Sequence, residues 1–186
     1  GCRLNLAESD VLRGLLAAER DLVVVNSCAV TAEAVRQTRQ AIRRARKARP
    51  EARVLVTGCA AEVERAALAA MGEVDGIIAN AEKLDPRAWN ACGARGLHAQ
   101  APAHTRAFVP MQTGCDHACT FCVIPKGRGA SRSQPVGAVL ADIARHLDAG
   151  AHEVVLTGVD LTSWGGDLAE APRLGALVTA ILTAFP

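Results

Sequence analysis

Three cysteines, Cys115, Cys119 and Cys122, lie within eight residues of one another. Thiolates this close together can converge on one metal centre, and cysteine thiolates are the usual ligands of iron-sulfur clusters. A 4Fe-4S cube is saturated by one protein ligand on each iron, so three thiolates leave one iron open. The spacing Cys-x3-Cys-x2-Cys therefore predicts a cube with one iron free for a further ligand.

His117 lies in the same stretch, and a structural zinc ion held by three cysteines and this histidine is the alternative. His117 lies inside the cysteine loop, whereas zinc ribbons pair their ligands at a fixed spacing. The sequence also has no second Cys-x2-Cys pair to complete a four-thiol site. We therefore favour the iron-sulfur interpretation, and the zinc interpretation remains the alternative.

A second set of thiols, Cys2, Cys28 and Cys59, is spaced by 26 and 31 residues. These spacings are close to the roughly 30 residues of one βαβ unit. Cys28 and Cys59 each follow a short β-branched run, so we expect the set to meet at the carboxyl edge of one parallel sheet. Buried apolar cysteines are the alternative for any one of them.

The elements that would position these thiols alternate between helix and strand. Apolar residues at helical spacing and short β-branched runs alternate along the first part of the chain. The expected order is helix 8–19, strand 22–25, helix 32–47, strand 53–57, helix 62–70 and strand 75–79. This order predicts an α/β domain with an open parallel sheet covered on both faces.

A stretch rich in Ala, Gly, Pro and His, without a sustained period, separates a second unit from the first. The second unit has a strand-helix-strand-helix order, which is the opening of a β/α barrel or a doubly wound sheet. Its expected elements are strand 106–112, irregular loop 114–132, helix 135–147, strand 153–157 and helix 174–184.

The composition sets limits on function. The net charge is only +2, no run approaches the length of a membrane span, and no signal pattern opens the chain. We expect a cytoplasmic protein without membrane contact. Seven cysteines without a secretory signal disfavour a disulfide framework. Aromatic residues are 3%, so a pure single-strand RNA module built on stacking is disfavoured.

Short motifs around both cysteine sets resemble the radical S-adenosylmethionine (SAM) methylthiotransferase family. They are Gly1-Cys-Arg-Leu-Asn5, Val25-Asn-Ser-Cys-Ala-Val-Thr31, Thr57-Gly-Cys-Ala60 and the segment from Gly114 through Cys122 to Arg132. The resemblance implies an N-terminal methylthiotransferase domain at 1–91, a linker at 92–105 and the start of a radical SAM barrel, truncated, at 106–186. Cys92 would then be a bystander.

The resemblance also implies cofactors. Cys2, Cys28 and Cys59 would hold an auxiliary 4Fe-4S cluster, and the Cys115 set would hold a second 4Fe-4S cluster that binds SAM. Arg128, on the loop after these cysteines, is expected to bind the cofactor. Asp160, at the end of the 153–157 strand, lies where barrel enzymes place active sites and is a second such candidate. The motifs identify no catalytic residue.

The family acts on three kinds of substrate: threonylcarbamoyladenosine in tRNA, isopentenyladenosine in tRNA, and an aspartate of a ribosomal protein. The Asn26 to Thr31 stretch followed by Ala-Glu-Ala resembles the first branch. The implied partners are the tRNA anticodon loop and an electron donor such as a flavodoxin or ferredoxin. A non-catalytic, zinc-stabilised binding module is the alternative of another class.

The helical stretch from Ala32 to Arg49 is strongly basic. It carries seven arginines and lysines against Glu33 alone, a local charge of +6. A contact with tRNA phosphates is one interpretation. An ordinary solvated helix face is the other, because charge runs usually face water.

Overall fold

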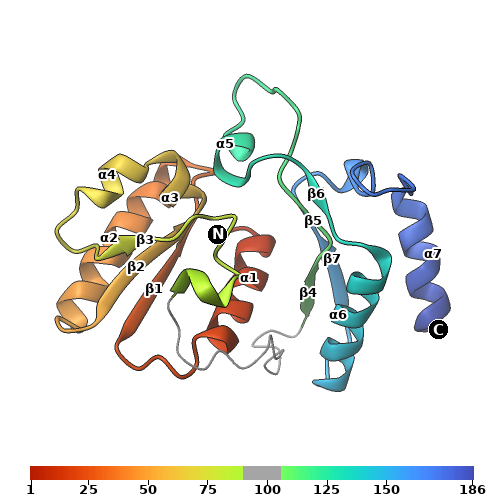
Figure 1. Cartoon of the computed structure of the whole chain (residues 1–186), viewed down its shortest axis with the longest axis horizontal. Coiled ribbons are helices and arrows are strands. Elements are labelled where there is room, and N and C mark those ends of the chain that lie inside the picture. The colour runs from red at the N-terminus through yellow and green to blue at the C-terminus, as the bar shows by residue number, and fades with distance from the viewer. Residues whose placement is uncertain (90–105) are drawn as a thin grey trace.

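The computed structural model describes residues 1–89 and 106–186, so Cys92 and the expected linker at 92–105 lie outside the described residues. The described chain forms helices around two parallel sheets (Figure 1), which confirms the predicted α/β class. The first sheet comes from the N-terminal half and the second from the C-terminal half. None of the described helices is long and apolar enough to cross a membrane.

The first sheet contains β1 (Leu22–Ser27), β2 (Arg53–Gly58) and β3 (Gly76–Ile77), in this order and all parallel. β2 is central, and its Val54 and Val56 are fully buried. A near-continuous apolar run is what a parallel strand covered on both faces requires. The three strands lie where the sequence predicts them, although the third has only two residues in the ladder.

Helices cover both faces of this sheet. Successive residues of β2 point to opposite faces. Val54 and Val56 pack with Ile42 on one face, whereas Leu55 packs with Leu12 on the other. The elements that supply these contacts are α1 (Arg3–Leu15), α2 (Ala32–Ala48), α3 (Cys59–Val63), α4 (Arg65–Ala69) and the 3-10 helix η1 (Pro86–Trp89).

Two predicted helices have the wrong bounds. The helix expected at 8–19 begins at Arg3 and ends at Leu15, because Cys2 caps it and Leu4 extends its buried face. The helix expected at 62–70 begins at Cys59 and breaks at Glu64, where φ is −114° and ψ is 26°. Periodicity reports the buried face of a helix and not its caps.

The second half repeats the strand-helix order. Its two long strands pair in parallel, and Val109, Ile143 and Leu177 form a buried cluster between these strands and the helices. The predicted strand-helix-strand-helix order is therefore present in this half. Its elements are β4 (Ala107–Pro110), α6 (Val136–Asp148), β7 (Val154–Thr157), the 3-10 helix η2 (Leu161–Ser163) and α7 (Leu174–Ala184).

The loop predicted to be irregular at 114–132 contains a short helix, α5 (Ile124–Arg128). Proline in the first turn of a helix is tolerated, and Gly129, at φ +75°, ends this one. The base of the loop is an antiparallel pair, β5 (Gln112–Thr113) with β6 (Arg132–Ser133).

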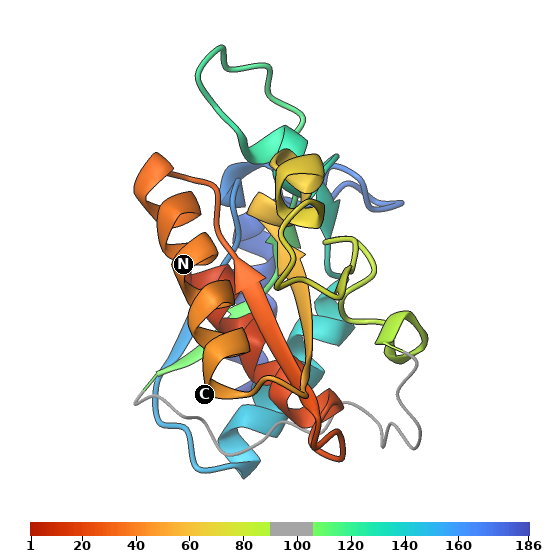
Figure 2. The same ribbon diagram turned by 90° about the vertical axis from the view of Figure 1, so that its left-hand side faces the viewer.

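The two halves are in direct contact. Helix α1 packs against both β1 and β4, and it lies between the two sheets in Figure 1. Helix α5 packs against α3, as Figure 2 shows from the side. The loop that carries the second cysteine set therefore rests on the edge of the first sheet.

Candidate metal centres

Cys28 and Cys59 lie at one edge of the first sheet. Cys28 directly follows β1, Cys59 directly follows β2, and both are free thiols. Carboxyl ends of neighbouring parallel strands lie at the same edge, which is where such sheets bind ligands. The expected placement of these two residues at strand ends is therefore observed.

Cys2 is linked to the loop of Cys28 through the first turn of α1. The Asn5 N–H donates to Cys2 Sγ at 3.4 Å. The Asn5 side-chain amide donates to the carbonyls of Asn26 at 3.2 Å and Ser27 at 3.4 Å, and Asn26 Nδ2 donates back to the Asn5 carbonyl at 3.1 Å. These bonds fix the start of α1 against the end of β1.

The backbones before Cys28 and Cys59 touch each other. Ser27 Oγ donates to the Thr57 carbonyl at 2.5 Å and accepts the Ala61 N–H at 3.1 Å. Gly58 has φ of +92°, and a Cβ there would lie 2.3 Å from the Ser27 carbonyl oxygen. Only glycine fits at this position. We call Cys2, Cys28 and Cys59 the first trio.

The first trio suits an iron-sulfur cube. Cys59 is buried, whereas Cys2 and Cys28 are half-buried. Burial raises the pKa of the Cys59 thiol, and the nearby charges of Arg128 and Lys83 act in the opposite direction. Cations beside a thiol favour the thiolate, which is the form that binds metal. Three thiols on three interlocked loops, with cations beside them, match the donor set of a cube with one open iron.

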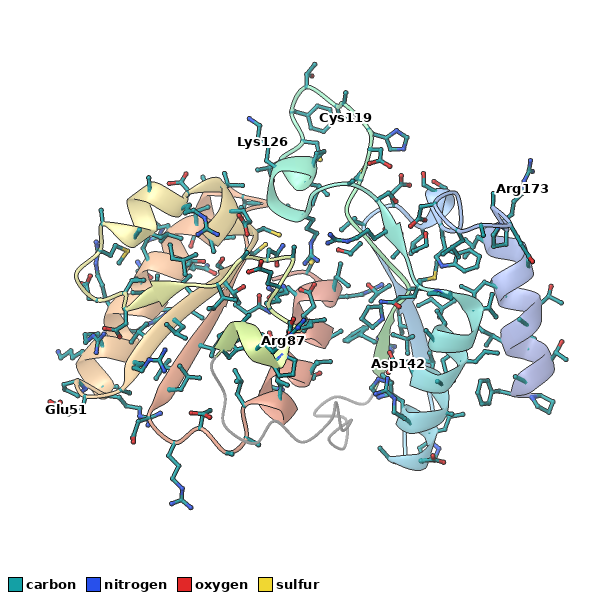
Figure 3. All side chains as sticks on the ribbon, viewed as in Figure 1. Glu51, Arg87, Cys119, Lys126, Asp142 and Arg173 are labelled. Atoms are coloured by element: carbon teal, nitrogen blue, oxygen red, sulfur yellow. The ribbon has the colours of Figure 1, made fainter. Side chains whose placement is uncertain are left out.

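The second trio, Cys115, Cys119 and Cys122, lies on a loop fixed mainly at its base. The Cys115 N–H donates to the Gly129 carbonyl at 3.0 Å. Gly114 has φ of +73°, and a Cβ there would lie 1.8 Å from the Ala130 carbonyl oxygen. Farther out the loop is open to solvent: Cys119 is exposed, and Figure 3 shows it with Lys126 on the outer part of this region.

Asp160 lies beside the first cysteine of the second trio. Its Oδ2 is 4.0 Å from Cys115 Sγ and 2.9 Å from His117 Nε2. Hydrogen bonds from Ser163 lower the pKa of Asp160, and His117 adds to this effect. Among the described residues, Cys115, His117 and Asp160 are the one group whose possible ligand atoms all lie within 4.8 Å. Sulfur, nitrogen and oxygen donors this close also suit zinc.

The segment that follows the second trio reaches the first trio at the junction between the halves. Gly127, on α5, lies so close to Cys59 that a Cβ on it would be 3.0 Å from Cys59 Cβ and 3.4 Å from Cys59 Sγ. Asn80 Nδ2 donates to the Gly127 carbonyl at 2.6 Å and lies 4.0 Å from Cys59 Sγ. Asn80 comes three residues after β3, so the end of the third strand could have identified it as a candidate in the sequence.

Arg128 is buried in this junction. Its side chain is 2% exposed, and its terminal nitrogens donate to Glu8 Oε1 at 2.8 Å and Oε2 at 3.1 Å. Glu8 also accepts from Lys83 Nζ at 2.6 Å. Neither Glu8 nor Lys83 could be identified from the sequence, because nothing in the local pattern distinguishes them from solvated charges. The expectation that Arg128 binds a cofactor stays a prediction.

Most basic residues of α2 have acidic partners. Thr38 and Ile42 are the buried residues of this helix. Five of the seven arginines and lysines between Ala32 and Arg49 form ion pairs, so the local positive charge is smaller than the sequence suggests, and the solvated-face interpretation gains support. The pairs are Arg36–Glu33, Arg39–Glu64, Arg43–Glu73, Arg46–Asp75 and Arg49–Asp21.

The sequence matches known proteins along its whole length. The model of the uncharacterized protein family UPF0004 matches residues 1–79. The threonylcarbamoyladenosine tRNA methylthiotransferase MtaB of Rickettsia prowazekii (strain Madrid E) is 38% identical over 202 residues, which cover 100% of this chain and 48% of that protein. The ribosomal protein uS12 methylthiotransferase RimO of Anaeromyxobacter sp. (strain Fw109-5) is 32% identical over 209 residues, which cover 96% of this chain and 44% of that protein.

A third relative, the tRNA-2-methylthio-N(6)-dimethylallyladenosine synthase of Erythrobacter litoralis (strain HTCC2594), is 27% identical over 94% of this chain and 46% of its own length. The chain thus spans about half the length of the relatives it matches. An α/β protein with two sets of three free cysteines on adjoining loops is a candidate metal-dependent enzyme. With these relatives, the chain belongs to the methylthiotransferase family.

Proposed function

We propose that the full-length protein is a radical SAM methylthiotransferase that places a methylthio group on carbon 2 of N6-threonylcarbamoyladenosine in tRNA. The reaction replaces a C–H bond by C–S–CH3. The observation that carries the proposal is the contact of Gly127 with Cys59, because it brings the loop of the second trio against the first trio. Insertion of sulfur at a carbon radical requires the radical-forming site and the sulfur-carrying site to be close together.

The second trio would hold the 4Fe-4S cluster that binds SAM, in the opening strand-helix units of a β/α barrel at 106–186. When bound, this cluster supplies the electron that cleaves SAM. The hydrogen bond from Cys115 to Gly129 holds the first ligand against the base of the loop. Asp160, kept ionised beside Cys115, suits a hydrogen bond from a hydroxyl or ammonium group of SAM.

The first trio would hold the auxiliary 4Fe-4S cluster, in the domain at 1–91. The bonds of Asn5 and Ser27 hold its three loops together before any metal binds. The burial of Cys59 keeps water away from its side of the cluster.

The proposed partners are the tRNA anticodon loop and an electron donor such as a flavodoxin or ferredoxin. Three relatives at 31–38% identity carry the threonylcarbamoyladenosine tRNA name, which supports this substrate. The RimO relative at 32% identity makes a ribosomal protein the second candidate substrate. Both candidates use the same two metal centres.

Complementation of a bacterial strain that lacks its own threonylcarbamoyladenosine methylthiotransferase tests the proposal. The full-length coding sequence should restore the 2-methylthio nucleoside, measured by mass spectrometry of digested tRNA. Cys59→Ala and Cys119→Ala should each abolish it, whereas Cys92→Ala, outside both trios, should not. A methylthio group on ribosomal peptides, and none on tRNA, would exclude the tRNA substrate and support the ribosomal protein. A colourless, zinc-loaded full-length protein would overturn it.

A further inference from the structure

The junction between the halves contains a buried cluster of three charged side chains. Glu8 comes from α1, Lys83 from the segment after β3, and Arg128 from α5. The side chains of Lys83 and Arg128 are each 2% exposed and that of Glu8 is 9% exposed. Two cations against one carboxylate leave a net charge of +1 in a largely buried region.

Almost every polar atom of this cluster has a partner. Both Glu8 oxygens accept hydrogen bonds, and Lys83 Nζ also lies 3.4 Å from Asn26 Oδ1. Arg128 Nη1 donates to Thr113 Oγ1 at 3.1 Å as well as to Glu8. These contacts fix the guanidinium plane.

Arg128 Nε is the exception. It is buried and has no hydrogen-bond partner in the part of the chain that the structure describes. An unsatisfied buried N–H of this kind is unfavourable, so it calls for an acceptor. The guanidinium that carries it is held rigidly, and its N–H direction is therefore set by the protein.

The position of Arg128 indicates which acceptor. Arg128 directly follows Gly127, the residue that lies against Cys59. Burial lowers the pKa of Arg128, but the hydrogen bonds and charge of Glu8 outweigh it and, with smaller contributions from Cys59 and Cys2, raise that pKa above its ordinary value. The guanidinium therefore remains charged beside the first trio.

We infer that the Arg128 Nε–H donates a hydrogen bond to a sulfur atom of the iron-sulfur cluster held by Cys2, Cys28 and Cys59. Glu8 and Lys83 are positioning residues, which hold the guanidinium so that this N–H faces the cluster. The inference rests on the proposed function in one respect, that the first trio holds a cluster. It assigns Arg128 to the auxiliary cluster, although Arg128 follows the second trio in the sequence.

A hydrogen bond from a cation to a cluster sulfur has a measurable effect. One-electron reduction adds negative charge to the cluster, and the donor stabilises the reduced form more than the oxidised form. Hydrogen bonds to the sulfurs are among the factors that set the potential of a cluster. Loss of the Nε–H should therefore lower the reduction potential of the auxiliary cluster.

The experiment uses the full-length protein with Cys115, Cys119 and Cys122 replaced by alanine, so that only the first trio can bind a cluster. In this background Arg128→Lys keeps the charge but removes the Nε donor, and the midpoint potential is measured by redox titration followed by electron paramagnetic resonance. We expect a lower potential than in the parent. Arg3→Lys is the matched control, because Arg3 is exposed next to Cys2, and its potential should equal that of the parent.

A purely structural role for Arg128 would lower thermal stability without a change in potential, and that result overturns the inference. Pulsed paramagnetic resonance of the parent labelled with 15N-arginine gives a test that requires no variant at Arg128. We expect a 15N coupling to the reduced cluster that persists in Arg3→Lys, and its absence would refute the hydrogen bond. A parent that takes up no cluster at all contradicts the proposed function instead.

Discussion

The first and second trios differ in how much of their geometry the protein fixes without metal. Hydrogen bonds of Asn5 and Ser27 hold the three loops of the first trio, which start or end regular elements. The second trio lies on one loop whose described backbone bonds are mostly at its base, and Phe121 beside Cys122 is 92% exposed. We therefore expect the first trio to be preorganised and the second to gain order when it binds metal.

This difference has a physical reason. A parallel sheet aligns the ends of its strands, so ligands at those ends converge once the core is packed. A loop has no such core, and ordering it has an entropic cost that metal binding must offset. The four predictions that follow test this contrast, beginning with the residue that connects the two regions.

Glu8→Ala should give the largest effect. It leaves Arg128 and Lys83 buried without their carboxylate, and breaking a buried pair in this way costs about 3–5 kcal/mol. Urea unfolding of the full-length apoprotein measures this loss. Glu33→Ala is the control, because its pair with Arg36 is exposed and screened by solvent, so its loss should be much smaller. Equal losses of stability in the two variants would show that the buried cluster of Glu8 stabilises the protein no more than an exposed ion pair does.

Gly58→Ala should destabilise the protein by about 3 kcal/mol, because its φ of +92° and the Ser27 carbonyl at 2.3 Å leave no room for a methyl group. The iron content should fall by the share of the first trio only. Gly114→Ala, also at positive φ and with the Ala130 carbonyl oxygen 1.8 Å from a Cβ, should instead remove the share of the second trio, at a similar cost of about 3 kcal/mol.

Gly72→Ala is the control for both variants, since a Cβ there would meet no atom within 4 Å. It should leave the iron content and the unfolding midpoint unchanged. If Gly58→Ala and Gly114→Ala both abolished both clusters, the two trios would not be separate structural units.

Metal removal should affect the two trios unequally. Loss of iron and sulfide should speed amide hydrogen exchange in residues 114–123 by about tenfold or more, which corresponds to ~1.4 kcal/mol of lost protection. Exchange at the ends of β1 and β2 should change less, because the sheet holds them. Mass spectrometry of peptides from holo and apo full-length protein measures both regions. Equal changes would contradict the preorganisation of the first trio.

The sequence predicted what local patterns encode. The β-branched runs located β1 and β2, whereas the metal binding that the cysteine spacing predicts for both trios stays a prediction. It did not predict α5, because Pro125 and Gly127 normally interrupt helices and tertiary packing on α3 overrides that preference.

The junction could not be predicted for a different reason. Glu8 and Arg128 are 120 residues apart, and their pairing exists only when the two halves pack together. Isolated charges in a sequence are expected to face solvent. For the same reason the basic pattern of α2 overstated its free charge, since Glu64 and Glu73 come from other segments.

Asp75 gives the smallest expected effect, a pH dependence confined to the sheet that carries the first trio. Its carboxylate accepts from the Val54 N–H at 2.6 Å and from Arg46, and these bonds, the first foremost, lower the pKa of Asp75. A carboxyl group with a lowered folded-state pKa adds stability above its unfolded pKa of about 3.9 and loses it as pH falls through the folded value. The contribution is below about 1 kcal/mol, because the side chain is 42% exposed.

Asp75→Asn keeps an acceptor for Val54 but removes the charge. The stability difference between this variant and the parent apoprotein, measured by urea unfolding, should therefore be largest near about pH 7 and shrink as the pH falls below about 4. Exchange in residues 114–123 should not respond, because Asp75 stabilises the start of β2 and not the loop of the second trio. A constant difference across this pH range would show that the charge of Asp75 contributes no stability to the sheet.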